Sequence, residues 1–284
     1  MNADLHCHSA VSDGWLTPAE VVRRARANGA ELLALTDHDE VGGVAEAAAE
    51  AAALGLGFVG GVEVSVSWGD ETLHVVGLGV DAENPALCAG LAQVRSRRLA
   101  RAGQMAAALE QVGLRGVLEG ARRFARNPDM IGRAHFARHL VASGVARDVH
   151  SVFDHYLSRG KPGFVAHQWA TLAEAVGWIR GAGGVAVVAH PARYHRMSAT
   201  ELDKFFNAFI AEGGEGVEVV AGAHTTDEML RFASLARRKG LLASRGSDFH
   251  GPDESVVDVG RCNPLPPDLA PVWSRWNKLL MGVE

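Results

Sequence analysis

Short runs of apolar residues alternate along the chain with longer segments in which apolar positions recur every three or four residues. The apolar runs fall at residues 4–8, 32–37, 58–66, 185–190, 217–221 and 241–248. Runs of this length, separated by helical patterns, are typical of βα units that build a parallel sheet. The pattern therefore predicts an α/β protein in which these runs are buried strands.

Four of the segments between the runs begin with the capping-box pattern, in which Ser or Thr is followed three residues later by Glu. The pairs are Thr17 and Glu20, Thr171 and Glu174, Ser198 and Glu201, and Thr225 and Glu228. The two side chains of such a pair satisfy backbone N–H groups that lack a partner in the first turn of a helix. Each pair therefore predicts a helix start and supports the βα interpretation.

Two stretches depart from this alternation. Residues 71–81 follow the turn signal Trp68-Gly69-Asp70 and predict a hairpin that returns antiparallel to the strand at 58–66. The pattern then stays helical until about residue 162. We therefore expect an inserted helical subdomain at 86–162, between the two parts of a barrel domain at 1–85 and 163–284.

Charge separates this insert from the rest of the chain. Residues 95–138 contain ten arginines and three acidic residues, a local charge of +7, whereas the whole chain carries −5 and the remainder therefore −12. A basic helical insert beside an acidic body predicts a lid that binds an anionic substrate. Within it, we expect Arg97 and Arg98 to lie on a solvated helix face.

The composition is that of an ordinary globular protein, with 48% hydrophobic and 21% charged residues, which excludes a disordered or fibrous chain. Cys7, Cys88 and Cys262 form no C-x-x-C pair, which argues against a disulfide framework and a cysteine-built zinc site. The sequence contains neither a signal-peptide pattern nor an apolar run long enough to cross a bilayer. We therefore expect a cytoplasmic protein with no membrane partner.

Histidine is frequent, with 13 residues against 2 tyrosines, and many of the histidines stand with carboxylates at or near the ends of predicted strands. The nine residues concerned are His6, His8, Asp13, His38, Glu63, His74, His190, Asp248 and His250. Because the C-terminal ends of barrel strands meet at one face, we expect these side chains to converge. Imidazole mixed with carboxylate suits Mn²⁺, Fe²⁺ or Zn²⁺, so the set predicts a metal centre.

Some acidic and histidine residues in these segments have simpler explanations. Asp37 and Asp39 flank His38, and one of them is expected to cap the helix that follows. His74 alone could be a half-buried histidine with ordinary hydrogen bonds. Glu63 is harder to explain in this way, because it lies inside an apolar strand and a buried carboxylate without a partner is costly.

The ordered set of H-x-H, a downstream acid, T-D-H-D, an isolated strand glutamate, A-H-P and a terminal D-x-H resembles the polymerase-and-histidinol-phosphatase (PHP) phosphoesterase family. The resemblance covers both ends of the chain, with the insert between them. It implies a distorted (β/α)7 barrel and two or three divalent metals, for which we expect Mn²⁺, with Fe²⁺ or Zn²⁺ as alternatives. It would give the first metal His6, His8, Glu63 and Asp248, the second a bridging Glu63 with His74 and His190, and the third Asp13, His38 and His250.

Neighbouring dications bridged by Glu63 would lower the pKa of a shared water, hold it as hydroxide and bind the oxygens of a phosphoryl group. We therefore expect in-line attack of a metal-bridging hydroxide on a phosphate ester. His195 is a candidate proton donor to the leaving oxygen. The rest of an anionic substrate needs polar and cationic side chains, for which the candidates are Arg133, His135, Lys161 and Arg193.

The basic insert, with its R-x-H and R-G-K-P stretches, resembles those of nucleoside 3',5'-bisphosphate phosphatases and related 5'-to-3' ribonucleases. This resemblance implies removal of the 3'-phosphate from a nucleoside 3',5'-bisphosphate, with one phosphate at the metals and the other at the arginines. The alternatives within the family are a 5'-to-3' exoribonuclease acting on short RNA and a histidinol-phosphate phosphatase. We expect a nucleotide or short oligonucleotide as substrate and no obligate protein partner.

Two further alternatives belong to other classes. A metal-dependent amidohydrolase also begins with H-x-H, but such enzymes often bridge their metals through a carboxylated lysine. None of the four lysines of this chain lies at the end of a predicted ligand strand. A non-catalytic PHP module would tolerate lost ligands, whereas this chain has the full set.

Overall fold

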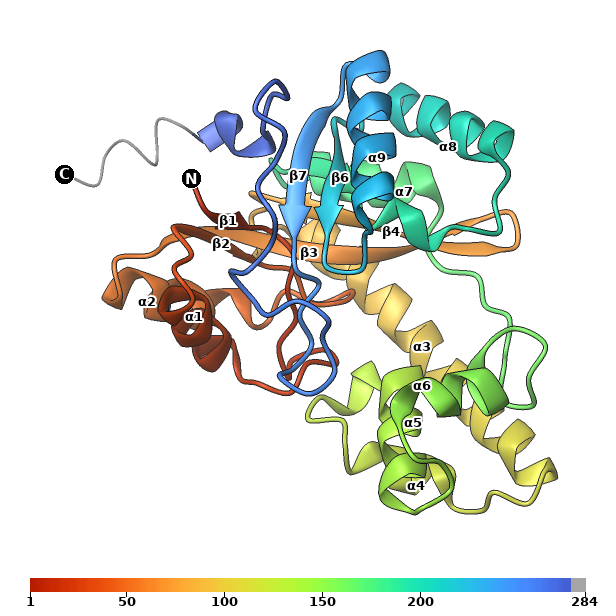
Figure 1. Cartoon of the computed structure of the whole chain (residues 1–284). Helices are drawn as coiled ribbons and strands as arrows, with labels where there is room; N and C mark the ends of the chain where they lie inside the picture. Colours follow the sequence, from red (N-terminus) through yellow and green to blue (C-terminus); the bar gives the residue numbers. More distant parts are fainter. Residues whose placement is uncertain (277–284) are drawn as a thin grey trace.

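The computed structural model describes residues 1–276, and over this range it confirms the predicted α/β barrel architecture (Figure 1). Within it, seven strands form one sheet in sequence order. They are β1 (Ala3–Asp4), β2 (Leu32–Leu35), β3 (Gly57–Trp68), β4 (Glu71–Leu78), β5 (Val185–Val188), β6 (Gly216–Ala221) and β7 (Leu242–Gly246). Neighbouring strands are parallel except at β4, which runs antiparallel to both β3 and β5, as the predicted hairpin requires.

The sheet nearly closes into a barrel where the segment after β1 meets β7. The Leu5 N–H donates to the Arg245 carbonyl at 3.0 Å, and the Asp248 N–H donates to the His6 carbonyl at 2.8 Å. Gly246 permits this approach, since a Cβ at this position would lie 2.2 Å from the Cβ of His6. The first and last predicted ligand segments are therefore adjacent.

Regular strand structure at this closure is shorter than the sequence predicted. β1 ends at Asp4 and β7 ends at Gly246, so neither strand reaches its predicted end at residue 8 or 248. The Asp4 carboxylate accepts the N–H of Ser247 at 2.9 Å and that of Gly260 at 2.7 Å. The Asp4 side chain thus accepts the Ser247 N–H, a donor that would otherwise pair with a backbone carbonyl and lengthen β7.

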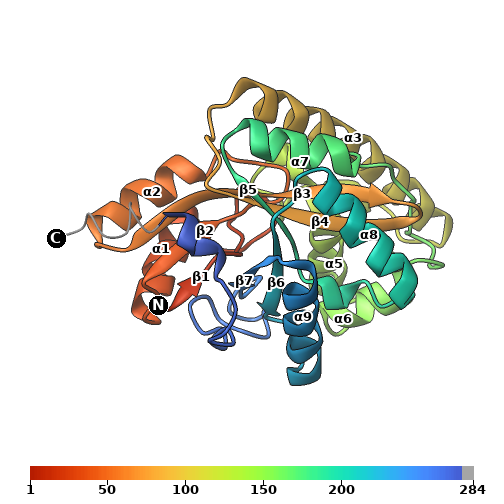
Figure 2. The same ribbon diagram turned by 90° about the horizontal axis from the view of Figure 1, so that it is seen from above.

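Helices surround the barrel, as the view from above shows (Figure 2). Four of them begin at the four predicted capping boxes, each of which has both of its reciprocal hydrogen bonds. The barrel helices are α1 (Pro18–Ala27), α2 (Val44–Ala53), α7 (Leu172–Gly181), α8 (Ala199–Ala211) and α9 (Thr226–Lys239), with single 3₁₀ turns η3 (Pro191–Arg193) and η4 (Val272–Trp276). In the described chain, no helix has the length and apolar character needed to cross a bilayer.

A second group of helices lies to one side of the barrel, reached through the long helix α3 (Figure 1). These helices are α3 (Pro85–Gln111), α4 (Val117–Arg122), the 3₁₀ turn η1 (Pro128–Met130), α5 (Arg133–Ala142), α6 (Val149–Val152) and the π-helical turn η2 (Phe153–Leu157). They share their own hydrophobic cluster, which includes Leu109, Phe136 and Leu157. We refer to residues 86–162 as the insert.

Candidate metal centre

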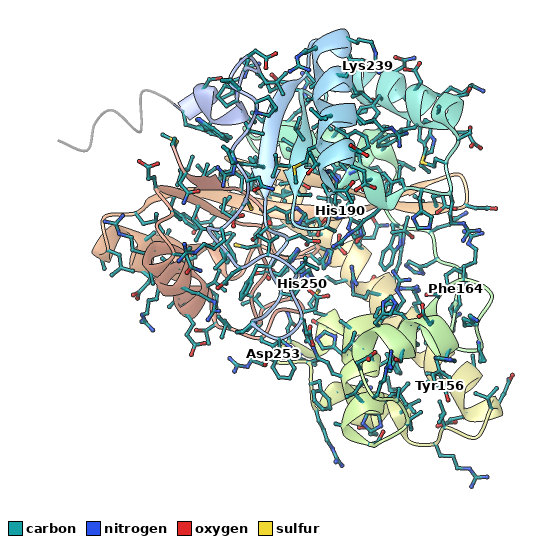
Figure 3. All side chains as sticks on the ribbon, in the orientation of Figure 1. Tyr156, Phe164, His190, Lys239, His250 and Asp253 are labelled. Carbon is teal, nitrogen blue, oxygen red and sulfur yellow. The ribbon has the colours of Figure 1, made fainter. Side chains whose placement is uncertain are left out.

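The nine predicted ligand residues lie together at the end of the barrel that faces the insert (Figure 3). Their ligand atoms form four groups, and within each group the atoms lie within 4.8 Å of one another. The groups are His8, Asp13, His38 and His250; His6, His8 and Asp248; His6, Glu63 and His190; and His38, Glu63 and His74. Because members are shared between groups, the cluster has the form of a multi-metal site rather than a single one.

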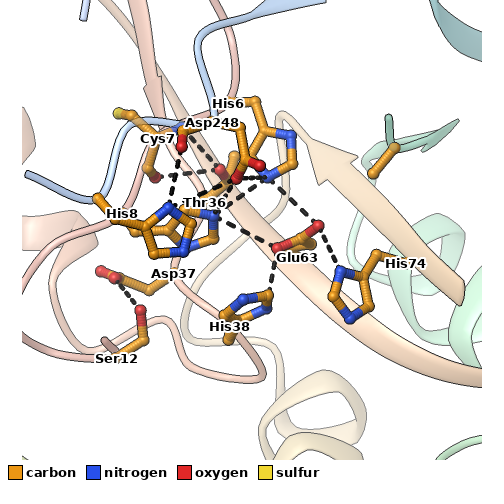
Figure 4. A network of polar contacts seen from close by, with 12 residues as sticks. His6, Cys7, His8, Ser12, Thr36, Asp37, His38, Glu63, His74 and Asp248 are labelled. Atoms are coloured by element: carbon orange, nitrogen blue, oxygen red, sulfur yellow. Dashed lines mark hydrogen bonds and ion pairs between the residues drawn. The ribbon is translucent and has the colours of Figure 1, made fainter. Parts of the chain in front are cut away.

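Glu63 is at the middle of this cluster (Figure 4). Its side chain is fully buried, with Oε1 2.9 Å from both His74 Nδ1 and His190 Nε2, and Oε2 2.8 Å from His38 Nδ1. Burial alone would raise the pKa of this carboxyl, but the imidazoles of His74, His38 and His6 hold it well below its usual value. The carboxylate is therefore charged and placed between two groups of nitrogen ligands, as a metal bridge would be.

Several buried atoms that point into the cluster make no well-oriented hydrogen bond within the described chain. They include the carboxylate oxygens Asp13 Oδ1, Glu63 Oε2 and Asp248 Oδ2, although each lies within 4.0 Å of an imidazole or guanidinium nitrogen. Poorly satisfied buried carboxylate oxygens are costly, and additional cations would stabilise them. Divalent cations fit this role, because the surrounding donors are imidazole nitrogens and carboxylate oxygens.

The predicted ligand histidines differ in protonation, because nearby carboxylates raise the pKa of His6, His38 and His250, whereas two others are neutral without a metal. Burial lowers the pKa of His8 to about 3, helped by the neighbouring His250 and His38. Burial likewise lowers the pKa of His190 to about 4, with Arg193 as the next cause. These imidazoles are neutral near pH 7, so each keeps a lone pair that a metal could use.

Glu218 in β6 is a buried carboxylate that the sequence analysis missed. Its Oε1 lies 2.7 Å from His6 Nδ1, and its Oε2 accepts the backbone N–H of His190 at 2.5 Å. A carboxylate behind a ligating histidine fixes the orientation of the ring and raises its basicity. The signal that could have found it is the one used for Glu63, namely a single acid inside an apolar strand.

Neither of the two aspartates beside His38 caps the next helix, so the prediction that one of them does is wrong. α2 begins after Gly43 and has no side-chain cap. Asp37 instead accepts the Ser9 N–H at 2.7 Å and the Ser12 hydroxyl at 2.5 Å. These bonds shape the loop between His8 and Asp13.

Three non-glycine residues of the described chain have positive φ, and all three lie at this end of the barrel. They are Asp39 at 47°, His190 at 26° and Asp248 at 54°. Such conformations are costly for residues with a side chain, and they persist where the surrounding contacts enforce them, often at functional sites.

A cavity of about 370 Å³ opens between the cluster and the insert. Its lining includes Asp13, His38, His74, Asp248 and His250 on the barrel side, and Arg98, Arg101, Arg133 and Arg193 around them. In the described chain, neither Arg101 nor Arg133 has a carboxylate within 4.0 Å. Burial, together with the neighbouring Arg133 and Arg98, lowers the pKa of Arg101 to about 9. This crowding of unpaired guanidinium groups is what an anion would relieve.

Arg98 is not on a solvated face, so that prediction is wrong. Its guanidinium pairs with Asp39, donates to the Ser65 hydroxyl at 3.1 Å and lies 4.7 Å from the ring centroid of Trp169. The reason is that the middle of α3 lies beside β3 and the cavity, which turns this face of the helix toward the site.

Of the four residues predicted to contact the substrate, two line the cavity and two do not. Arg133 and Arg193 line the cavity, whereas His135 and Lys161 line neither this cavity nor the adjacent one. His135 is buried at the start of α5, where its Nδ1 accepts the Gly132 N–H at 3.1 Å. Lys161 is exposed.

A second, outer cavity of about 770 Å³ adjoins the first, and Thr72, Arg101, Arg133 and Arg193 line both. His195 lines only the outer one, so its position gives no support to its predicted role as proton donor at the metal cluster.

The chain belongs to the PHP domain family, whose model matches residues 4–219. It is 57% identical over 272 residues, 96% of this chain and 95% of the relative, to the 3',5'-nucleoside bisphosphate phosphatase of Chromobacterium violaceum. It is 41% identical over 277 residues, 97% of this chain and 94% of the relative, to the 5'-3' exoribonuclease Rnm of Escherichia coli. Relatives of this similarity along almost the whole chain identify it as an enzyme, a phosphoric ester hydrolase.

Among solved structures, the fold resembles that of a Chromobacterium violaceum protein described as an amidohydrolase with bound sulfate and no metal. The TM-score is 0.94 and the sequence identity 55%, covering 98% of this chain and 96% of the other.

Proposed function

We propose that this enzyme removes the 3'-phosphate from nucleoside 3',5'-bisphosphates, giving a 5'-nucleotide and phosphate. The observation that carries the proposal is that one cavity joins the predicted metal ligands to Arg101 and Arg133, two cations without carboxylate partners. A substrate with two phosphates matches this arrangement, because one phosphate can bind at the metal ligands and the other at the two arginines. The name of the Chromobacterium violaceum relative supports the same substrate.

The proposed metals are two or three divalent ions, Mn²⁺ first, held by the nine ligand residues. Such ions supply a water of lowered pKa and polarise the oxygens of the phosphoryl group. Glu63 would hold negative charge between them, and Glu218 would keep His6 in its ligating orientation.

The cations of the chain would orient the substrate. Arg193 lines both cavities, and its Nη2 lies 2.5 Å from Asp248 Oδ2, so its charge would lie beside a phosphate bound at the metals. Arg101 and Arg133 would bind the 5'-phosphate, and Arg98, held by Asp39, would add to the positive potential around it.

Substrate preference tests the proposal. With Mn²⁺-loaded enzyme, we expect kcat/KM for adenosine 3',5'-bisphosphate to exceed that for adenosine 3'-monophosphate by about 10- to 100-fold, the worth of charged hydrogen bonds to the second phosphate. Arg133→Ala should remove most of this preference, chiefly through KM. Arg115→Ala, a change at an exposed arginine of the same insert, should leave it intact. Equal rates on the two substrates in the wild-type enzyme would contradict the proposal.

A second candidate function is 5'-to-3' exoribonuclease activity on short RNA. The observation that favours it is the outer cavity, whose lining adds Arg159, Arg196 and Phe164 to the shared arginines and could receive further nucleotides. The Escherichia coli relative is named for this activity. Stepwise release of mononucleotides from a 5'-phosphorylated RNA oligomer would establish it, and an intact oligomer under conditions that hydrolyse the bisphosphate would exclude it.

Amidohydrolase chemistry has less support. Glu63 is shared between two of the ligand groups, and Lys161, Lys204 and Lys239, the lysines in the described range, line neither cavity.

A further inference from the structure

Helix α5 of the insert carries two arginines with different surroundings. Arg133 begins the helix and lines the cavity. Arg138, five residues later, lines neither cavity, and only 3% of its side chain is exposed. A buried arginine outside the proposed phosphate site calls for a separate explanation.

The Arg138 guanidinium reaches from the insert to two loops of the barrel. Its Nε and Nη2 contact the two carboxylate oxygens of Glu254 at 2.8 and 2.6 Å, in the bidentate geometry that fixes both partners. The same Nη2 donates to the backbone carbonyl of Asp13 at 2.7 Å. The group also lies 4.6 Å from the ring centroid of Trp15.

Those two loops carry Asp13 and His250, which belong to one candidate ligand group. Asp13 Oδ1 lies 3.4 Å from His250 Nε2, and the Trp15 N–H donates to the His250 carbonyl at 2.7 Å. The His250 N–H in turn donates at 2.7 Å to the hydroxyl of Ser255, the residue after Glu254. The loops are therefore tied to each other, and Arg138 ties both of them to the insert.

We propose that Arg138 is a positioning residue that sets, from the insert, the geometry of the ligand group formed by His8, Asp13, His38 and His250. The inference rests on the metal centre of the proposed function, but it concerns how the chain shapes one part of that centre. Under this proposal, a residue of the insert influences metal affinity, although the insert contributes none of the nine predicted ligands.

The shared helix has a consequence for substrate binding. Because α5 carries both Arg133 and Arg138, an anion bound at Arg133 and a metal bound at the Asp13 group favour the same docked position of the insert. Coupling of this kind is reciprocal, so each ligand should tighten the binding of the other.

Calorimetric titration of the metal-free full chain with Mn²⁺ tests the proposal, supported by metal content after gel filtration. We expect the group of His8, Asp13, His38 and His250 to be the weakest Mn²⁺ site, because three of its four members are only half-buried. In Arg138→Met this site should lose about 10- to 100-fold in affinity, the usual cost of removing a group that orients a ligand. The tighter sites should keep their affinity. Arg138→Lys should recover only part of the loss, because a lysine cannot reproduce the bidentate contact.

Two further variants make the test specific. Glu254→Gln should weaken the same site, and it tests the contact from the barrel side if Arg138→Met fails to fold. Arg122→Met is the matched control, since Arg122 is an exposed arginine of the insert that pairs with Glu119. It should bind Mn²⁺ like the wild type.

Adenosine 5'-monophosphate, the expected product, probes the coupling. It should tighten the weakest Mn²⁺ site in the wild type and have less effect in Arg138→Met.

Unchanged Mn²⁺ affinities in both Arg138→Met and Glu254→Gln would overturn the proposal. Equal weakening of every site would also overturn it, because that result indicates a general loss of structure. The readout is metal binding, so a wild-type enzyme that binds Mn²⁺ as expected but leaves the bisphosphate intact would overturn the proposed function alone.

Discussion

At the residue scale, the most informative feature of the candidate metal centre is a pair of carboxylates buried inside the barrel. Glu63 in β3 and Glu218 in β6 contact the two ring nitrogens of His6, and in the described chain neither pairs with a lysine or arginine. Isolated buried carboxylates are unfavourable unless paired, so their presence in apolar strands implies a cationic partner. Residue types and their order therefore sufficed to predict the nine ligand candidates.

What the sequence could not provide at this scale was the orientation of individual side chains. Asp37 and His38 are neighbours in sequence, yet one bonds two serines of a loop while the other faces Glu63. The strained backbone at Asp39 and Asp248 is likewise enforced by tertiary contacts, and no local pattern reveals it.

Removing the charge of Glu218 should weaken the site without removing a ligand. In Glu218→Gln we expect Mn²⁺ affinity and kcat to fall by about 10- to 100-fold, because the carboxylate that orients His6 and accepts the His190 N–H is lost. Metal titration and steady-state kinetics measure the two effects. Glu215→Gln, a change near the start of the same strand at a residue paired with Arg275, should behave like the wild type. Wild-type values for Glu218→Gln would show that the carboxylate has no such role.

At the scale of elements, the helix starts were the most predictable feature, because a capping box is a local interaction between residues three apart. The strand ends near the barrel closure were the least predictable, because the segment after β1 meets β7 across almost the whole length of the sequence. The face that α3 presents to the site was also hidden, since its arginines occur on several faces and only packing against the barrel selects Arg98 and Arg101.

Arg101 on α3 should contribute to binding of the second phosphate. Its guanidinium lines both cavities and has no carboxylate within 4.0 Å in the described chain, so it is available to an anion. In Arg101→Met we expect kcat/KM for the bisphosphate to fall by about 10- to 100-fold, because a charged hydrogen bond to the phosphate is lost. Steady-state kinetics should show a much smaller change for adenosine 3'-monophosphate. A fall of equal size for both substrates would contradict this role.

The close approach of β7 to the segment after β1 should tolerate no side chain at Gly246. A Cβ there would meet the Cβ of His6 at 2.2 Å, so Gly246→Ala should lower the free energy of unfolding by about 1–3 kcal/mol and also weaken Mn²⁺ binding. Urea denaturation and metal titration measure these effects. Gly103→Ala in α3, where a Cβ would meet nothing within 4 Å, should instead be neutral or stabilising by up to about 1 kcal/mol. Similar stability of the two variants would refute the role assigned to this contact.

At the scale of the whole molecule, a basic insert faces an acidic barrel end, and the cavities lie between them (Figure 3). The charge pattern predicts that the two parts divide the work of binding, and this stays a prediction. Which cations enter the cavity depended on how the insert docks. Arg138 illustrates the limit, because its partners Glu254 and Asp13 are 116 and 125 residues away and carry no shared local pattern.

The central claim is that the phosphate removed is the one at the 3' position, with the 5'-phosphate held by the insert. Phosphorus NMR of a reaction between the Mn²⁺-loaded enzyme and adenosine 3',5'-bisphosphate tests this most directly. We predict inorganic phosphate and adenosine 5'-monophosphate in equal amounts, and neither product after the metals have been removed with a chelator. Accumulation of adenosine 3'-monophosphate, or no release of phosphate by the metal-loaded enzyme, would contradict the account.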